Sequence, residues 1–302
     1  MTSTAVPGSA LVPTPTMMQR RAAAYPLSAA LALVTVAGTV PTILFPDLLR
    51  GPAAMNGSAR GTALMMLVGG VPLLLGSMGA AHRGSTRGIV LWLGAVAYLG
   101  YNGVMLLLGT AFNALFLFYD AILGLSIWAA ITLLHRVDVE AVAARFTPGL
   151  RARPVAAFIW VIVALNTLVW LRGLLPGLVA EGTPAFLVGT GLTTFPTYVQ
   201  DFAFWLPLFT VTAWWLWQRQ AWGLLLSPAL LAYFVLEGLG VAVDQAWGHA
   251  ADPTSTVVSA DLVPGFAVLA LLCAGVLAHL LHHLDPHGRT ADSVGAAGRS
   301  DG

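Results

Sequence analysis

Residues 221–243 read AWGLLLSPALLAYFVLEGLGVAV, an almost unbroken apolar run with one ionisable side chain, Glu237. A transmembrane helix needs about 20 apolar residues, so this run is long enough to cross a bilayer. A carboxyl group at the centre of such a helix costs about 2.5–3.5 kcal/mol on insertion scales, and it therefore tends to face a partner or a cavity. Asp120 occupies a second apolar run, residues 112–135. These two acids are the first candidates for a functional site.

The composition of the whole chain points to a membrane protein. Of its 302 residues, 58% are hydrophobic and 9% are charged, and the mean hydropathy is +0.81. Such values lie outside the range of soluble globular proteins. The single cysteine, Cys273, excludes a disulfide framework or a cysteine zinc site within one chain, and the lack of lysine excludes a Schiff-base mechanism. The net charge of +1 gives no reason to expect nucleic acid as a partner.

Eight apolar segments are found with a window of about 20 residues. They are residues 26–45, 61–81, 88–109, 112–135, 154–175, 201–219, 221–243 and 260–284. We therefore predict an all-α polytopic membrane helical bundle of about eight transmembrane helices. The Pro/Ser/Thr-rich residues 1–19 and the Gly/Ser/Ala-rich residues 285–302 are predicted to be disordered cytoplasmic tails.

An internal repeat relates residues 72–109 to residues 207–244 at a constant offset of 135, without a gap. The identities include prolines and glycines, which mark a kink, a helix start and a close packing point. We predict two four-helix halves in the same orientation, residues 20–135 and 154–284, joined by a cytoplasmic linker, residues 136–153. Chance identity among apolar residues is the alternative. The identical pairs are Pro72/Pro207, Leu73/Leu208, Gly88/Gly223, Leu91/Leu226, Ala97/Ala232, Tyr98/Tyr233 and Gly103/Gly238.

The distribution of arginine predicts the orientation in the membrane. Cytoplasmic loops of membrane proteins carry an excess of Arg and Lys. With both termini in the cytoplasm of a bacterial cell, three arginines stay outside, Arg50, Arg60 and Arg172, and eleven lie inside. Trp170 is expected in the aromatic belt at the outer interface. The eleven inner arginines are Arg20, Arg21, Arg83, Arg87, Arg136, Arg145, Arg151, Arg153, Arg219, Arg289 and Arg299.

Three polar residues on three predicted helices share one depth. Asn102, Asp120 and Glu237 each lie seven or eight residues from the outer end of their segment, which is roughly 10–12 Å at 1.5 Å per residue. The repeat also places Asn102 opposite Glu237. We therefore predict an outward-facing polar cleft that binds a ligand or a proton. Further residues expected at or above this level are Tyr101, Tyr119, Asn113, Arg172, Asp201, Asp244 and Asp261.

Each candidate also has a structural explanation, which the sequence leaves open. Asn102 and Asn113 can form interhelical hydrogen bonds. Asp120 can be a hydrogen-bonded carboxyl group without a further role. Asp201 can cap the sixth helix, where the N-terminal dipole favours an acid. Arg172, the one cation at this level, can reach the lipid headgroups.

Histidines repeat at i, i+4 and i+8 near the end of the chain, as His279, His283 and His287. This spacing makes His279 and His283 weak candidates for metal ligands. Pro286 interrupts the helix, however, and histidine suits the cytoplasmic end of a helix without a metal. No HExxH, GxSxG, Walker or GxGxxG motif occurs in the required context, so we predict no metal and no cofactor.

Three segments carry a resemblance to known sequences. They are GTAFNALFLFYD at 109–120, PTYVQD at 196–201 leading to Leu206-Pro207-Leu208, and RQAWG at 219–223. They resemble segments of a group of uncharacterised bacterial multi-pass membrane proteins, over the third to seventh spans. The resemblance implies a helical bundle in the bacterial inner membrane, and it implies no activity.

Three functional classes remain open. Small-solute or proton-coupled transport or sensing is favoured because transporters combine duplicated halves, Pro and Gly within spans, and carboxylates at one depth. A membrane-embedded enzyme with Asp120 and Glu237 as an acid/base pair on a lipophilic substrate is the first alternative. A non-catalytic assembly partner is the second. The expected partners are membrane lipids and an unknown small molecule or proton, and the oligomeric state is not predicted.

The topology can be tested with cysteines placed in the two longest loops. In a Cys273→Ala background, Pro148→Cys should be shielded in intact cells and Ala185→Cys should react with an impermeant maleimide, because 136–153 is predicted inside and 176–200 outside. Labelling is read on a gel, with lysed cells as the control. Labelling at 148 but not at 185 would reverse the assignment.

Overall fold

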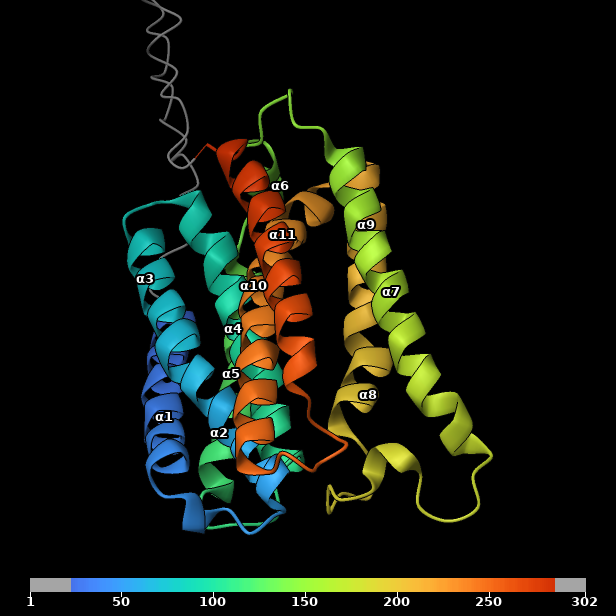
Figure 1. Ribbon diagram of the computed structural model, residues 1–302. Coiled ribbons are helices and arrows are strands. Elements are labelled where there is room, and N and C mark those ends of the chain that lie inside the picture. Colours follow the sequence, from blue (N-terminus) through green and yellow to red (C-terminus); the bar gives the residue numbers. More distant parts are fainter. Residues whose placement is uncertain (1–22, 286–302) are drawn as a thin grey trace, which may run out of the picture.

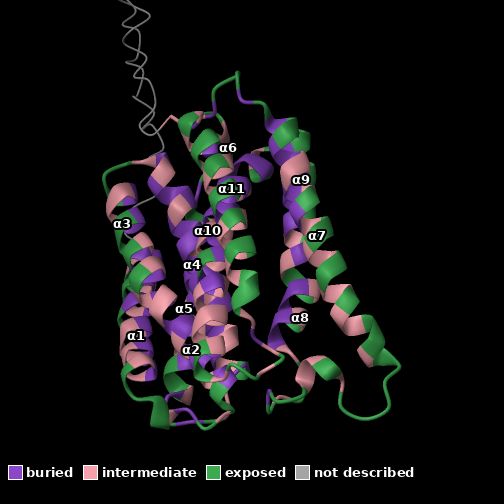
Figure 2. Ribbon diagram, in the orientation of Figure 1, coloured by how far each residue is buried: buried purple, intermediate pink, exposed green. Residues whose placement is uncertain are grey.

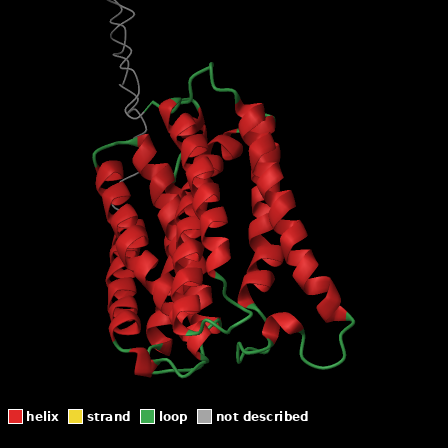
Figure 3. Cartoon of the chain, viewed as in Figure 1, coloured by secondary structure: helices red, strands yellow, loops and turns green. Residues whose placement is uncertain are grey.

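The computed structural model describes residues 23–285, in which helices bundle side by side without any β-strand (Figures 1 and 3). Most of both predicted tails therefore lies outside the described residues. Long helices dominate, and short turns connect them. The helices are α1 (Ala24–Leu44), α2 (Ala53–Met65), η2 (Met66–Gly70), α3 (Val71–His82), α4 (Thr86–Leu108), α5 (Phe116–Arg136), α6 (Val139–Ala143), α7 (Ala152–Leu178), α8 (Pro196–Gln200), η4 (Asp201–Trp205), α9 (Leu206–Trp217), α10 (Ala221–Ala251) and α11 (Val263–His282), with one-turn helices η1 (Pro46–Leu48), η3 (Ala185–Leu187) and η5 (Ala260–Leu262).

Seven helices in the described part of the chain are long and apolar enough to span a membrane. The predicted all-α polytopic bundle is thus confirmed. An eighth long helix, residues 196–217, combines α8, η4 and α9 and packs between α7 and α10. The central α4 and α10 are largely buried, whereas α7 and α11 expose most of their length (Figure 2). Many of the exposed side chains are large and apolar, which suits contact with lipid.

Three helices extend at one end by five or more residues beyond the segment that the hydropathy pattern predicts. The second helix begins at Ala53 rather than at 61, the sixth begins at Pro196 rather than at 201, and α10 ends at Ala251 rather than at 243. The predicted segments stopped at these points because polar residues lower the hydropathy there. In the structure, helical hydrogen bonding continues through these residues. Asp252-Pro253 is the stop signal that ends α10, because proline cannot continue a helix.

The additional turns of α2 and α10 pack directly on each other through glycine. Gly57 and Gly61 form a GxxxG pair on α2. A Cβ atom at Gly61 would stand 2.8 Å from the Cα of Asp244, and one at Gly57 would stand 2.6 Å from the carbonyl oxygen of Trp247. Such spacing brings two backbones into contact, which stabilises helix pairs in a membrane.

The backbone repeats at the predicted offset of 135. The π-helices η2 and η4 match residue for residue, as do α3 and α9, and α4 and α10 begin at equivalent positions. Gly84 and Arg219, which are equivalent, both have positive φ, 84° and 56°. A proline follows each π-helix at the second position of the next helix, and its missing N–H explains the displaced hydrogen bonding.

The two halves differ in how their outer helices meet. In the first half α1 packs along α5, whereas among the described residues α7 and α11, their counterparts, make few or no contacts. The second half is therefore open where the first is closed. The complete four-helix duplication and its axis along the membrane normal remain a prediction. The predicted linker 136–153 contains a short helix, α6.

Within residues 23–285, the members of the two arginine groups lie towards opposite ends of the bundle. The turn at 83–85, the segment 137–151 and the turn at 218–220 share one end, which we call the Arg-rich end (Figure 1). The connections 45–52, 109–115 and 179–195 share the other end. Which end faces the cytoplasm remains a prediction.

Close packing of α2 on α10 predicts a cost for a single methyl group. Gly61→Ala should lower the free energy of unfolding by about 1–3 kcal/mol, because its Cβ meets backbone that must move. Gly124→Ala is the matched control, since a Cβ at this helical glycine of α5 meets no atom within 4 Å. Thermal unfolding in detergent measures both, and equal effects would contradict the proposed contact.

Candidate functional site

A cavity of about 310 Å³ lies between α7, η4, α9, α10 and α11, with α2 and α4 closing its side. Its position corresponds to the gap between α7 and α11 in the second half. Following the helix directions, the lining residues of α7, α9 and α11 nearest the Arg-rich end are apolar, whereas those of α4 and α10 are Tyr101 and Tyr233. The apolar floor consists of Ile162, Phe209, Phe234 and Leu269. The volume is at the lower end of the range for small-molecule sites.

Glu237 on α10 meets Asn102 on α4 at the cavity wall. The Asn102 Nδ2 donates to Glu237 Oε2 at 2.8 Å and to the Tyr98 carbonyl oxygen at 3.1 Å. The two residues occupy equivalent positions in the repeat, 135 residues apart. Helices α4 and α10 are equivalent in the repeat and pack against each other. Their equivalent residues, Asn102 and Glu237, therefore come into contact.

Asp201 is the first residue of the π-helix η4 and lines the cavity from the α9 side. Trp170 Nε1 on α7 donates to its Oδ2 at 2.7 Å, and Tyr101 and Asn166 also hydrogen-bond to this carboxyl group. The expected role as a helix cap is wrong, because the helix already begins at Pro196. The extra residue of a π-helix re-aims the side chains around it, which suits a functional position.

Asp244 is a third acid on the cavity wall. It lies seven residues after Glu237 on the same face of α10, which corresponds to about 10.5 Å along the helix. Gln245 Nε2 donates to Asp244 Oδ1 at 3.0 Å, and Gln245 Oε1 accepts from the Ser259 N–H at 2.9 Å. The sequence placed Asp244 at the end of its span. The seven-residue spacing from Glu237 was the signal that would have paired them.

Aromatic rings form the wall beside Glu237. Trp205 stacks on Tyr233 with ring centroids 4.7 Å apart and planes 9° apart. Tyr101 is 5.6 Å from Tyr233 and 5.8 Å from Trp205. The sequence analysis expected Trp170 in an interfacial belt, because a hydropathy pattern does not distinguish a cavity wall from a membrane interface.

The charges around the cavity are unbalanced. Asp201, Glu237 and Asp244 line it, and no lining residue is Arg or His in a chain without Lys. Arg60 on α2 is held elsewhere, with its guanidinium bound to the Ile43 carbonyl oxygen and lying 5.3 Å from the Trp247 ring. The other titratable groups facing Glu237 are tyrosines, Tyr98, Tyr101 and Tyr233, while α2 and α11 contribute none to the lining.

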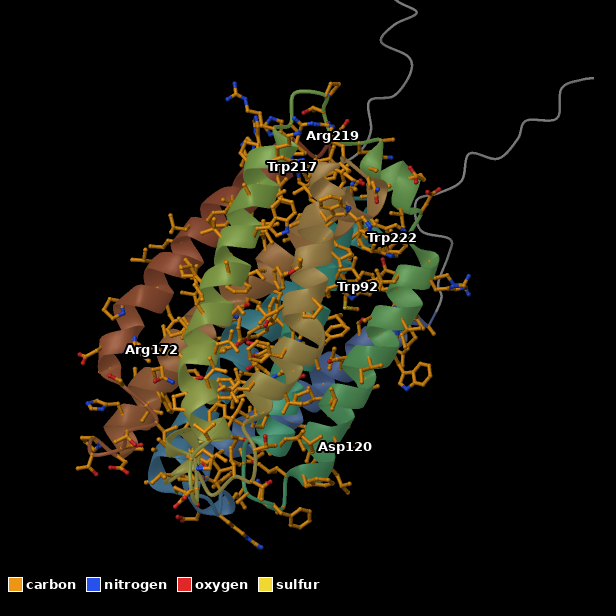
Figure 4. The ribbon with its side chains drawn as sticks, turned by 90° about the vertical axis from the view of Figure 1, so that its right-hand side faces the viewer. Trp92, Asp120, Arg172, Trp217, Arg219 and Trp222 are labelled. Carbon is orange, nitrogen blue, oxygen red and sulfur yellow. The ribbon has the colours of Figure 1, made fainter. Side chains whose placement is uncertain are left out.

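Four of the eight predicted site residues line the cavity, namely Asn102, Glu237, Tyr101 and Asp201. Asp120 does not, because its side chain is exposed on α5 (Figure 4). Arg172 is also exposed, and Figure 4 shows it on the opposite side of the bundle from Asp120. The prediction that Asp120 faces the same cavity as Glu237 is therefore wrong: depth follows from residue count, but direction around the helix axis does not.

The two remaining candidates serve local structure. Tyr119 is buried and shares a hydrogen bond of 2.6 Å with the Thr42 hydroxyl, which joins α5 to α1. Asn113 holds the turn before α5, since its Oδ1 accepts from the Leu115 N–H at 2.9 Å and its Nδ2 donates to the Ala111 carbonyl oxygen at 2.9 Å. The polar group of Tyr119 thus joins two packed helices, and that of Asn113 stabilises a turn.

His279 and His283 stand one turn apart, with ring centroids at 4.5 Å. His283 Nδ1 lies 3.0 Å from the His279 carbonyl oxygen. Between residues 23 and 285, no group of three or more His, Cys, Asp or Glu side chains is arranged to hold a metal ion. His287, the third member of the predicted series, lies outside the described residues.

The contact between Trp170 and Asp201 predicts a stability effect. Trp170→Phe keeps most of the ring but removes the N–H donor, so it should lower the free energy of unfolding by about 1–3 kcal/mol. Trp128→Phe on α5 is the control, since this side chain is 60% exposed. Thermal unfolding in detergent should separate the two. Indistinguishable midpoints would show that the hydrogen bond does not stabilise the fold.

This arrangement can bind a small ligand that offers hydrogen-bond donors or positive charge to carboxylates, within largely apolar walls. Comparison of the chain with protein-family models, with curated proteins and with solved structures finds no match.

Proposed function

We propose that this membrane protein binds a small solute in the cavity and that Glu237 exchanges a proton during a cycle of transport or sensing. The observation that carries the proposal is a cavity inside the membrane-spanning bundle whose wall holds three acids and no cation. Ionisable residues within membrane spans mark ion, substrate and proton pathways. Glu237 has one donor, Asn102, and a free face towards the cavity.

The architecture supports a cycle of this kind. Repeated hairpins with interrupted helices beside a site near the middle of the membrane are typical of secondary transporters. Here the interruptions are η2 and η4, and the site borders η4. The apolar floor separates the cavity from the Arg-rich end, as expected for a state that is accessible from one side only.

The alternative of a membrane-embedded enzyme required Asp120 and Glu237 as an acid/base pair. Asp120, however, lies outside the cavity that Glu237 lines. Glu237 and Asp244 are about 10.5 Å apart along α10, too far for one proton to pass directly between them. A role as a non-catalytic assembly partner would not require the cavity. Transport or sensing therefore remains the proposal.

Glu237→Gln tests the role of the proton. The change preserves the shape of the side chain and an oxygen that accepts from Asn102, so expression and the unfolding midpoint should stay nearly unchanged. Infrared difference spectra between acidic and alkaline buffer should lose the C=O band of a protonated carboxyl group in apolar surroundings. Asp120→Asn, which alters an exposed acid, should keep that band. Identical spectra for wild type and Glu237→Gln would contradict the proposal.

A further inference from the structure

The chemistry of the cavity wall narrows the class of ligand. We infer that the cavity binds a small organic cation, an amine or quaternary ammonium compound with an apolar body, whose positive charge lies between Glu237 and the rings of Trp205, Tyr233 and Tyr101. This inference rests on the proposed function and specifies its solute.

Charge balance is the first argument. A carboxylate inside a membrane protein is costly unless it is paired, and the lining provides three carboxyl groups without a basic side chain. Asp201 receives three donors from the protein, but Glu237 receives one and Asp244 receives only that of its neighbour Gln245. Between residues 23 and 285, no side chain that lines the cavity supplies a positive charge to pair with them, so it is the ligand that brings this charge.

The aromatic rings are the second argument, independent of the acids. A cation within about 6 Å of a Trp or Tyr ring face is attracted by the ring quadrupole, most strongly where water is excluded. Trp205 and Tyr233 form a stacked pair next to Glu237, and Tyr101 adds a third ring. The rest of the lining is mainly aliphatic or aromatic, which suits an apolar body rather than a hydrated metal ion.

The repeat gives a third argument. At the equivalent positions of the first half, Asp201 is replaced by Met66, Glu237 by Asn102, Asp244 by Gly109, and Trp205 by Gly70. The paired helix, π-helix and turn form in both halves, so the hairpin itself does not need the acids or Trp205. These side chains occur in the half that supplies most of the cavity lining, as expected if they serve its ligand.

Binding of such a cation competes with a proton at Glu237. When the carboxyl group is protonated, its O–H bond breaks as the cation arrives and the proton passes to water; the carboxylate then pairs with the cation. Lower pH therefore opposes binding. This exchange links the ligand to the proton step of the proposed function.

The test uses isotope-labelled phenyltrimethylammonium, a permanent cation, with the full chain in lipid nanodiscs. Binding should saturate, weaken in acidic buffer, and become about tenfold weaker in Glu237→Gln, the scale of one lost contact to a charged group. Asp244→Asn is a second variant, expected to weaken binding in the same direction. Asp120→Asn should bind like the wild type. Unlabelled tert-butylbenzene, the neutral isostere, and benzenesulfonate, an anion of similar size, should not compete.

Several results would overturn the inference. Equal competition by tert-butylbenzene would show that the cavity selects only apolar shape, and competition by benzenesulfonate would show that charge sign is irrelevant. Displacement by sodium ions would assign the site to an inorganic ion. Absence of binding, with the infrared band of Glu237 intact, would reject the cation and leave the proton role standing. A carboxyl C=O band that is the same in the wild type and in Glu237→Gln would reject the proposed function itself.

Discussion

Helix α10 contacts α2, α4, α9 and α11 and carries Tyr233, Glu237 and Asp244, so its packing positions a large part of the site. In a bilayer the hydrophobic effect does not drive helices together, so close packing of small residues and interhelical hydrogen bonds stabilise their association. Gly57 and Gly61 allow α2 to touch α10 backbone to backbone, and Asn102 binds Glu237 from α4. These two contacts fix the height and rotation of α10, and thereby the direction in which its acids point.

Duplication explains how a polar cavity can exist in such an apolar chain. Both halves use the same hairpin, in which a π-helix precedes a proline and a turn with positive φ precedes the next long helix. The first half is filled, since α1 lies against α5 and Met66 is fully buried. In the second half α7 stands apart from α11, and Asp201 and Asp244 occupy the positions of Met66 and Gly109. One hairpin geometry thus supports a packed scaffold on one side and a binding site on the other.

The acids are distributed so that each has a different environment. Asp201 is held by Trp170, Tyr101 and Asn166, Glu237 by Asn102, and Asp244 by Gln245. A group with many donors is fixed in place, whereas one with a single donor can accept a ligand or a proton. Glu237 and Asp244 are therefore the groups that can exchange a proton or pair with a ligand, and Asp201 is a group that positions the aromatic wall.

The sequence by itself determined the membrane class, the approximate number of long helices and the offset of 135, because bilayer thickness and the special backbone of proline and glycine leave direct marks in a sequence. It also brought Asn102 and Glu237 together through the repeat. It did not determine which way Asp120 points, how far α10 extends, or that Asp244, Trp170 and Trp205 line the cavity. Lipid and protein interior are both apolar, so hydropathy gives the depth of a residue but not the face of the helix on which it lies. Only the packing of neighbouring helices decided that Glu237 faces a cavity while Asp120 is exposed.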